Sequence, residues 1–181
     1  STVVTGIALI GEVLSTTLVA YGFSRFRVPG RNLLFVLVLS TMMLPGEVTL
    51  IPQFLMFRAL GWIDTYRPLT VPAYFATGAF YIFLLRQFFL TIPLDLDESA
   101  RLDGAGSLRI LLSILLPLCK PAIATVGIFT FLGHWDAFLL PLIYLNTMTK
   151  YTLPIGLRYF QVTPDAGGLP KDHLLMAASL M

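Results

Sequence analysis

Residues 93–117 read PLDLDESARLDGAGSLRILLSILLP and form a polar, glycine-containing segment between two long apolar runs. Pro93 suits the first position of a helix, where its missing N–H is not needed. Carboxylates occupy the turns that follow, where the helix dipole favours negative charge, namely Asp95, Asp97 and Glu98. Gly104 can adopt the left-handed conformation that ends such a helix, Ser107 can cap a second helix, and Pro117 ends or bends it. The segment therefore predicts two helices joined by a sharp turn rather than an extended linker.

The composition is that of a membrane protein. The chain is 56 % hydrophobic and 12 % charged, with a mean hydropathy of +0.81. Soluble domains carry about twice that share of charged residues. The net charge of +2 is too small to indicate nucleic-acid binding. The single cysteine, Cys119, excludes an internal disulfide and a cysteine-based zinc or iron–sulfur centre.

Four apolar runs are long enough to cross a bilayer, which takes about 20 residues: residues 2–23, 33–57, 69–90 and 121–145. The second run is interrupted by Pro45-Gly46 and Pro52, which predict either a gating hinge or a static kink. Residues 174–181 have the apolar pattern of the first turns of a fifth span. We therefore predict an all-helical, polytopic transmembrane bundle of about four full spans plus the start of a fifth, with residues 1–181 forming a single domain.

The 93–117 loop carries a recognisable spacing. It fits the pattern E-A-A, three residues, G, nine residues, I-x-L-P, through Glu98, Ala100, Gly104, Ile114, Leu116 and Pro117, with Ser99 in place of the second alanine. At a usage of roughly 5–10 % for each residue type, six such matches coincide by chance about once in ten million positions. The loop thus resembles the signature loop of the transmembrane subunits of binding-protein-dependent ABC importers. FRVPGRN, TMMLPGEVTLIPQF, FLLRQFF and IFTFLGHWDAFLLPLIYL resemble the sugar-importer branch of that family, the maltose-type second permease subunit, and imply its type I permease fold.

Basic residues predict the orientation of the chain in the membrane. They cluster in the turn after the first run and around the 93–117 loop: Arg25, Arg27, Arg31, Arg86, Arg101, Arg109 and Lys120. The positive-inside rule places both connections in the cytoplasm, and residues 58–68 and 146–171 outside. Because Ser1 would then lie outside with no span to carry it there, we expect a longer subunit of six spans. The resemblance implies the plasma (inner) membrane of a prokaryote.

The resemblance also implies what the 93–117 loop does. It would be a coupling helix that docks into a groove on a cytoplasmic ATPase subunit, with Glu98 pairing with a basic group there. Arg101 and Asp103 would line the same contact, and Gly104 would let the two helices meet closely. The expected docking set is Glu98, Ser99, Ala100, Arg101, Asp103, Gly104, Ile114, Leu116 and Pro117, of which the last three pack the loop onto the spans. From the residues alone, the alternative is an amphipathic loop that is merely solvated.

Acidic residues inside the apolar runs predict a translocation pathway. Glu47 and Asp136 lie roughly 24 Å along a helix from the nearest cytoplasmic cation, and Glu12 about 20 Å. An ionisable group in the middle or outer half of a ~30 Å core is costly unless it faces water or a partner. We expect acceptors for sugar hydroxyls and aromatic stacking from Glu47, Trp135, Asp136, Phe138 and Tyr144. The alternative is interhelical hydrogen bonding, and Glu12, which departs from the family pattern, carries the least weight.

The sequence offers no pattern for catalysis. It contains no G-x-x-x-x-G-K-[ST] phosphate loop, and its two histidines, His134 and His173, have no ligand partners at metal spacing. No serine, histidine and acid set falls on a recognisable elbow. We therefore predict no catalytic residue, no metal and no cofactor bound by this chain. If ATP and Mg²⁺ drive the protein, a partner subunit uses them.

The combined prediction is a permease subunit of an ATP-driven importer that forms half of the pathway for a sugar or oligosaccharide. Its partners would be ATP-binding cassette subunits, a second related permease subunit, an extracytoplasmic solute-binding protein and the lipid bilayer, with no nucleic acid. A glycerol phosphoester is the alternative solute, although no span carries an arginine or lysine at mid-depth. Alternatives of other classes are a polytopic membrane enzyme using Glu47 or Asp136 and a structural membrane scaffold.

Overall fold

The computed structural model describes residues 1–162 and Met176. Over these residues the chain is helical and contains no strand, which confirms the predicted fold class. The longest helix is α1 (Thr2–Arg25), followed by α2 (Arg31–Ser40), η1 (Thr41–Met43) and α3 (Gly46–Ala59). The third run forms α4 (Arg67–Thr70), η2 (Val71–Phe75) and α5 (Ala79–Thr91). The predicted fifth span lies outside the described residues except for Met176.

The second half of the chain begins with the short helix α6 (Asp95–Leu102). Then come α7 (Ser107–Ile110), a π-helical turn η3 (Leu111–Leu115) and α8 (Leu116–Leu118). The remaining elements are α9 (Lys120–Trp135), α10 (Leu139–Tyr144), η4 (Met148–Lys150) and α11 (Leu153–Val162). The predicted helix–turn–helix arrangement of the 93–117 loop is therefore present as α6 and α7.

Among the described residues, two stretches are long and apolar enough to cross a membrane, Thr2–Arg25 and Arg67–Thr91, and up to four are if each bent pair counts as one span. In the first bent pair, Arg31–Met43 meets Gly46–Ala59 at 98°. Pro45 causes this break, because a proline lacks the N–H that would continue the helix and keeps Leu44 extended. Pro52 lies inside α3 without ending it. Of the two breaks predicted in this run, the one at Pro45-Gly46 is therefore a sharp bend between two helices, and the one at Pro52 does not interrupt α3.

The fourth predicted span is divided. Residues 121–145 form α9 and α10 with a break at Asp136–Phe138, where one continuous helix was expected. Pro141 explains the break, since its ring would clash with the carbonyl of residue 137 in a continuous helix. A second bend, of 82°, separates Ser107–Leu118 from Lys120–Trp135.

Helix α1 lies at the centre of the packing, against α5, α9 and η2. It buries small and hydroxyl side chains such as Ala8, Gly11, Ser15 and Ala20, which allow neighbouring backbones to approach closely. The main core lies between α1, α5 and α9 and includes the fully buried Leu85, Phe89, Ile110, Leu115 and Val126. Exposed aliphatic side chains cover α2 and α3, as expected for surfaces that face lipid or another membrane subunit.

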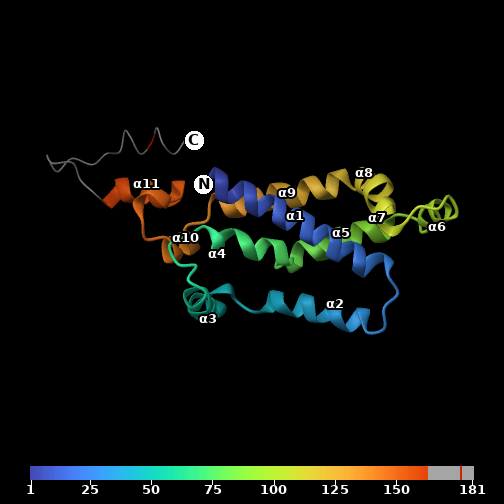
Figure 1. Cartoon of the computed structure of the whole chain (residues 1–181), viewed down its shortest axis with the longest axis horizontal. Coiled ribbons are helices and arrows are strands. Elements are labelled where there is room, and N and C mark those ends of the chain that lie inside the picture. The colour runs from blue at the N-terminus through green and yellow to red at the C-terminus, as the bar shows by residue number, and fades with distance from the viewer. Residues whose placement is uncertain (163–175, 177–181) are drawn as a thin grey trace.

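The two ends of the molecule differ in a way that matches the predicted sidedness. Figure 1 shows α6 projecting at one end, near the connection between α1 and α2. The corner helix α3, α10 and α11 lie at the opposite end, together with the N-terminus. The connections that the basic residues assigned to one side therefore share one end of the molecule.

Candidate functional site

Helix α6 presents most of its surface outwards. Only Asp97 and Ala100, three residues apart and therefore on one face, are buried. Six of the predicted docking residues are exposed: Glu98, Ser99, Arg101, Asp103, Gly104 and Pro117. Leu102, which the sequence analysis did not single out, is 89 % exposed. The outer face of α6 thus combines acids, an arginine and an apolar side chain.

Gly104 ends α6 in the left-handed conformation, with φ of +80°. The N–H of Ala105 donates to the carbonyl of Ala100 at 2.9 Å, and the N–H of Gly104 donates to that of Arg101 at 3.0 Å. These are the two hydrogen bonds of a Schellman motif. A Cβ at Gly104 would meet nothing within 4 Å. The expectation of close helix packing at Gly104 is therefore wrong within this chain, and its backbone conformation is what requires glycine.

The remaining docking-set residues lie after the turn. Ile114 and Leu116 are partly buried against the main core, as expected, whereas Pro117 is exposed. The deepest anchors here are Ile110, Leu111 and Leu115, each at most 2 % exposed. The loop is therefore seated on the bundle mainly by a row of residues next to those predicted.

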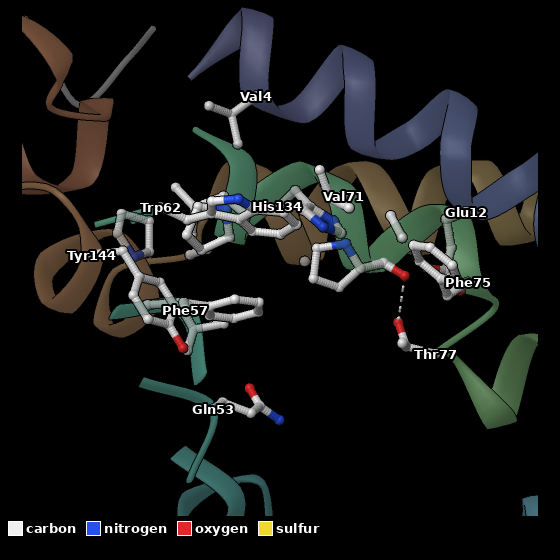
Figure 2. A pocket seen from close by; sticks show the side chains of 18 of the residues that line it. Val4, Glu12, Gln53, Phe57, Trp62, Val71, Phe75, Thr77, His134 and Tyr144 are labelled. Carbon is white, nitrogen blue, oxygen red and sulfur yellow. Dashed lines mark hydrogen bonds between the residues drawn. The ribbon is translucent and has the colours of Figure 1, made fainter. Parts of the chain in front are cut away.

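A cavity of about 660 Å³ opens on the other half of the molecule, between α1, α3, η2, α9 and α10. Figure 2 shows Phe57, Trp62 and Tyr144 gathered at one end, with Glu12 and Phe75 at the other. The ring of Phe57 stacks on Trp62 at 5.6 Å between centroids and meets Tyr144 edge-on at 5.5 Å. Polar side chains interrupt this apolar lining: Glu12, Gln53, Thr77, Tyr81, His134 and Tyr144.

Of the five residues predicted for the pathway, Tyr144 lines the cavity. Its side chain is 1 % exposed, and its hydroxyl has no hydrogen-bond partner among the described residues. Trp135 stacks on Phe131 at 5.3 Å, and the guanidinium of Arg158 lies 5.8 Å from the ring of Phe138. Glu47 and Asp136 are exposed and do not line the cavity. The structure thus brings one of the five to the cavity and leaves the other four apart from it.

Glu12, which received the least weight in the sequence, lies at the cavity instead. It is 4 % exposed, and its Oε1 accepts a hydrogen bond from the N–H of Gly78 at 3.1 Å. Ser15, one turn along α1, donates to the carbonyl of Ala73 at 2.7 Å and accepts from the N–H of Ala76 at 3.2 Å. These side chains satisfy backbone groups that the break between η2 and α5 leaves without helical partners.

One sequence signal pointed to this arrangement. Thr77-Gly78 interrupts an apolar run at membrane depth, and such interruptions are found where a span lines a cavity. A Cβ at Gly78 would collide with the carboxylate of Glu12, so glycine is required where Glu12 reaches the backbone. His134 was considered only as a metal ligand, whereas its Nδ1 lies 2.9 Å from the carbonyl of Thr130 and its side chain lines the cavity.

The lining of the cavity includes an acidic side chain but no lysine or arginine among the described residues. Its ionisable groups are Glu12, His134 and two tyrosines. Among the described residues, no group of three or more His, Cys, Asp or Glu side chains could hold a metal ion. The chemistry that this lining can offer is therefore hydrogen bonding to hydroxyls and stacking on aromatic rings.

Asp64 joins two connections at the end of the molecule opposite α6. Its backbone is left-handed, with φ of 59°, and its N–H donates to the carbonyl of Tyr144 at 2.7 Å. Its carboxylate accepts from Lys150 Nζ at 2.8 Å, from the N–H groups of Asn146 and Thr147 at 3.0 Å, and from the Thr147 hydroxyl at 2.6 Å. Lys150, followed by the Thr147 and Asn146 donors, holds the pKa of Asp64 far below its usual range.

Comparison with known proteins places this architecture in a family. The model of the binding-protein-dependent transport system inner membrane component family matches residues 13–169. The chain is 39 % identical over 171 residues to the sn-glycerol-3-phosphate transport system permease protein UgpE of Brucella abortus, covering 94 % of this chain and 60 % of that protein. It is 37 % identical over 169 residues to the polygalacturonan/rhamnogalacturonan transport system permease protein YtcP of Bacillus subtilis, covering 92 % and 57 %.

A solved structure gives the same result for the fold. The chain resembles a chain of a bacterial ABC transporter involved in the import of the acidic polysaccharide alginate, with a TM-score of 0.76 and 31 % sequence identity. The match covers 90 % of this chain and 58 % of that one. The chain therefore belongs to the inner membrane components of binding-protein-dependent transport systems, as the resemblance of its loop had indicated. It spans about 60 % of the length of the relatives named above.

Proposed function

We propose that this chain forms the membrane permease part of an ATP-driven importer and contributes half of its translocation pathway. The observation that carries the proposal is the 93–117 loop, whose helix α6 projects from the bundle with an exposed face of acids, Arg101 and Leu102. Besides Leu102, at 89 %, the loop exposes Leu94, Leu96 and Leu108, which are 40–62 % exposed. Several exposed apolar side chains beside polar ones are typical of a protein-contact surface. A protein surface that covers this face accounts for it.

The partner at this face would be a cytoplasmic ATP-binding cassette subunit, which binds and hydrolyses ATP with Mg²⁺. Glu98 and Asp103 would meet basic groups there, and Leu102 would fill an apolar depression. A second, related permease subunit would close the other side of the cavity, and an extracytoplasmic solute-binding protein would deliver solute at the Asp64 end. No catalytic step is assigned to this chain.

The solute that best suits the cavity is a neutral, hydroxyl-rich molecule of the carbohydrate class. Glu12, Gln53 and Thr77 offer polar atoms, and the Phe57–Trp62–Tyr144 group offers aromatic faces for a sugar ring. The predicted pathway residues Glu47, Trp135, Asp136 and Phe138 remain candidates for the part of the path that the second permease subunit completes.

A glycerol phosphoester is the second candidate, because UgpE, 39 % identical to this chain, is a permease of sn-glycerol-3-phosphate transport. A phosphate group favours an arginine or lysine partner, and the described part of the cavity contains neither. The second permease subunit would then have to supply the positive charge.

Uptake by the complete importer, reconstituted in proteoliposomes with its own binding protein, separates these solutes. Neutral oligosaccharides, uronate oligosaccharides and sn-glycerol-3-phosphate would be compared as radiolabelled solutes with ATP inside. The cavity predicts ATP-dependent uptake of a neutral oligosaccharide. Uptake of only sn-glycerol-3-phosphate would replace the first candidate by the second, and ATP-independent uptake would contradict the importer proposal.

A further inference from the structure

The 93–117 loop is fastened to the last turns of α1 by a buried ion pair. Arg25 Nε lies 3.2 Å from Asp97 Oδ2, and the two side chains are only 2 % and 6 % exposed. Arg25 also donates from a terminal guanidinium nitrogen to the carbonyl of Ile92 at 3.1 Å, at the point where the chain leaves α5 and enters the loop. One α1 side chain therefore holds both the entry to the loop and the buried face of α6.

Tyr21, four residues earlier on α1 and thus on the same face, holds the chain just after the turn that follows α6. Its hydroxyl donates to the carbonyl of Ser107, the first residue of α7, at 3.0 Å. Its ring packs edge-on against Phe89 and Phe26, with centroids 6.4 and 5.4 Å apart. Adjacent turns of α1 thus hold the chain before and after α6.

Apart from this fastening, α6 has little attachment to the bundle. Asp97 and Ala100 are its only buried residues. A buried ion pair adds little net stability over an apolar pair of similar volume, yet loss of one partner leaves an uncompensated charge. We therefore expect this ion pair to fix the position of α6 on α1 rather than to raise the folding stability of the bundle.

The same helix reaches the cavity without a break. Helix α1 is continuous from Thr2 to Arg25, and Val4 and Glu12 on its other half line the cavity. Glu12 and Arg25 are 13 residues apart in the sequence, which corresponds to roughly 20 Å along the helix. Since Glu12 also holds the backbone of the interrupted span at Gly78, a displacement of α1 would move the cavity wall.

We propose that Arg25 and Asp97 are positioning residues that make α6 and α1 move as one body, so that motion of the ATPase subunit reaches the cavity. This inference rests on the proposed docking of α6 and identifies how that contact is coupled to the pathway. Docking uses the exposed face of α6, whereas transmission uses its buried face. The two steps can therefore be lost separately.

The test uses the complete importer in proteoliposomes and compares Arg25→Ala, Asp97→Asn and the exchange Arg25→Asp/Asp97→Arg. Arg27→Ala is the matched control, because Arg27 is two residues away, is exposed and lines the same surface depression beside α6. Three quantities are measured: the ATPase subunit retained on purification, the rate of ATP hydrolysis, and the solute transported per ATP.

We expect both single variants to retain the ATPase subunit and to hydrolyse ATP, while solute transported per ATP falls about fivefold or more. The exchange should recover part of this ratio, and Arg27→Ala should keep it. An unchanged ratio in both single variants would overturn the proposal. So would a loss of ATPase retention in the single variants, which would make the pair part of docking. Failure of the wild type to retain an ATPase subunit would instead remove the docking proposal on which this inference rests.

Discussion

At the scale of single residues, Gly104 forms the left-handed turn that ends α6. Its φ of +80° is strained for a residue with a side chain, although asparagine and aspartate tolerate this region better than alanine does. Because no atom of the chain lies within 4 Å of the position of a Cβ, a small side chain would point into open space. Substitutions at Gly104 can therefore alter a partner contact while leaving the bundle folded.

We predict that Gly104→Asp inserts into the membrane normally and reduces solute uptake at least about tenfold, the equivalent of ~1.4 kcal/mol at the docking contact. Gly104→Asn is the matched control for side-chain size without charge, and it should fall between the wild type and Gly104→Asp. The measurements are uptake in proteoliposomes and the amount of subunit in the membrane fraction. Wild-type uptake by Gly104→Asp would count against the docking role.

Glu12 gives a second prediction at this scale, on stability. In Glu12→Gln the side-chain oxygen can still accept from the N–H of Gly78, whereas in Glu12→Ala that N–H loses its partner inside the membrane. An unsatisfied buried donor costs about 1–3 kcal/mol, so Glu12→Ala should unfold at a clearly lower temperature in detergent and Glu12→Gln should stay close to the wild type. Equal destabilisation by both substitutions would show that the charge, rather than the hydrogen bond, is what matters.

At the scale of elements, the Asp64 cluster joins the connection after α3 to the segment between α10 and η4. Lys150, Thr147 and Asn146 stabilise the ionised carboxylate of Asp64 and lower its pKa in the folded protein. A lowered pKa means that the unfolded chain binds the proton more readily, so the cluster stabilises the fold above the usual Asp pKa of about 3.9. This contribution begins to decline as the pH falls below that value, and it is fully lost only as the pH falls through the lowered pKa of the folded protein.

For Asp64→Asn we therefore predict lower stability than wild type by a margin that is constant between about pH 5 and 8. Below about pH 4 the margin should shrink, because the Asp64 carboxylate of the unfolded wild-type chain then becomes protonated while that of the folded protein is still ionised. Thermal unfolding of both proteins in detergent from pH 3 to 8 measures it. A margin that stays the same or grows at pH 3 would exclude the carboxylate as the source.

Breaks in helices show what could be predicted at this scale. The corner at Pro45-Gly46 could be predicted because a proline removes a backbone donor whatever surrounds it. The break at Ala76–Gly78 is different, since Ser15 and Glu12 from α1 supply its hydrogen bonds. An apolar run alone does not reveal which distant side chains will support its interruption. The prediction treated residues 121–145 as one span because of their apolar length. Pro141 nevertheless prevents one continuous helix over them, and the structure divides them into α9 and α10.

At the scale of the whole molecule, the two functional regions differed in how far the sequence could predict them. The 93–117 loop is built from local signals, namely an acidic first turn and a left-handed glycine, so its two helices and the turn between them could be predicted. The predicted cap was wrong, because Gly106 precedes α7 and Ser107 is the first residue of that helix. The cavity is built from residues far apart in the sequence, such as Glu12, Gln53, Thr77 and His134. Depth along a helix identified acids in the membrane, but depth does not say which way a side chain points, and Glu47 and Asp136 are exposed and do not line the cavity.

Helix α1 connects the two functional regions of the molecule. It buries the polar groups that support the interrupted span, and it holds the chain on both sides of α6, at Ile92 and Ser107. The two functional regions lie in opposite halves of the molecule (Figure 1), and this helix contacts both. Energy from ATP can reach the cavity by this route only if the loop contacts an ATPase subunit.

Site-specific photocrosslinking tests this contact in membranes that contain the permease subunit and an ATP-binding cassette subunit of an importer. A photoreactive amino acid at Leu102, 89 % exposed on the loop, is compared with the same residue at Met148, 58 % exposed at the opposite end. We predict a crosslink to the ATPase subunit from position 102 and none from position 148. No crosslink from position 102, or equal crosslinks from both positions, would contradict the docking of the 93–117 loop on an ATPase subunit.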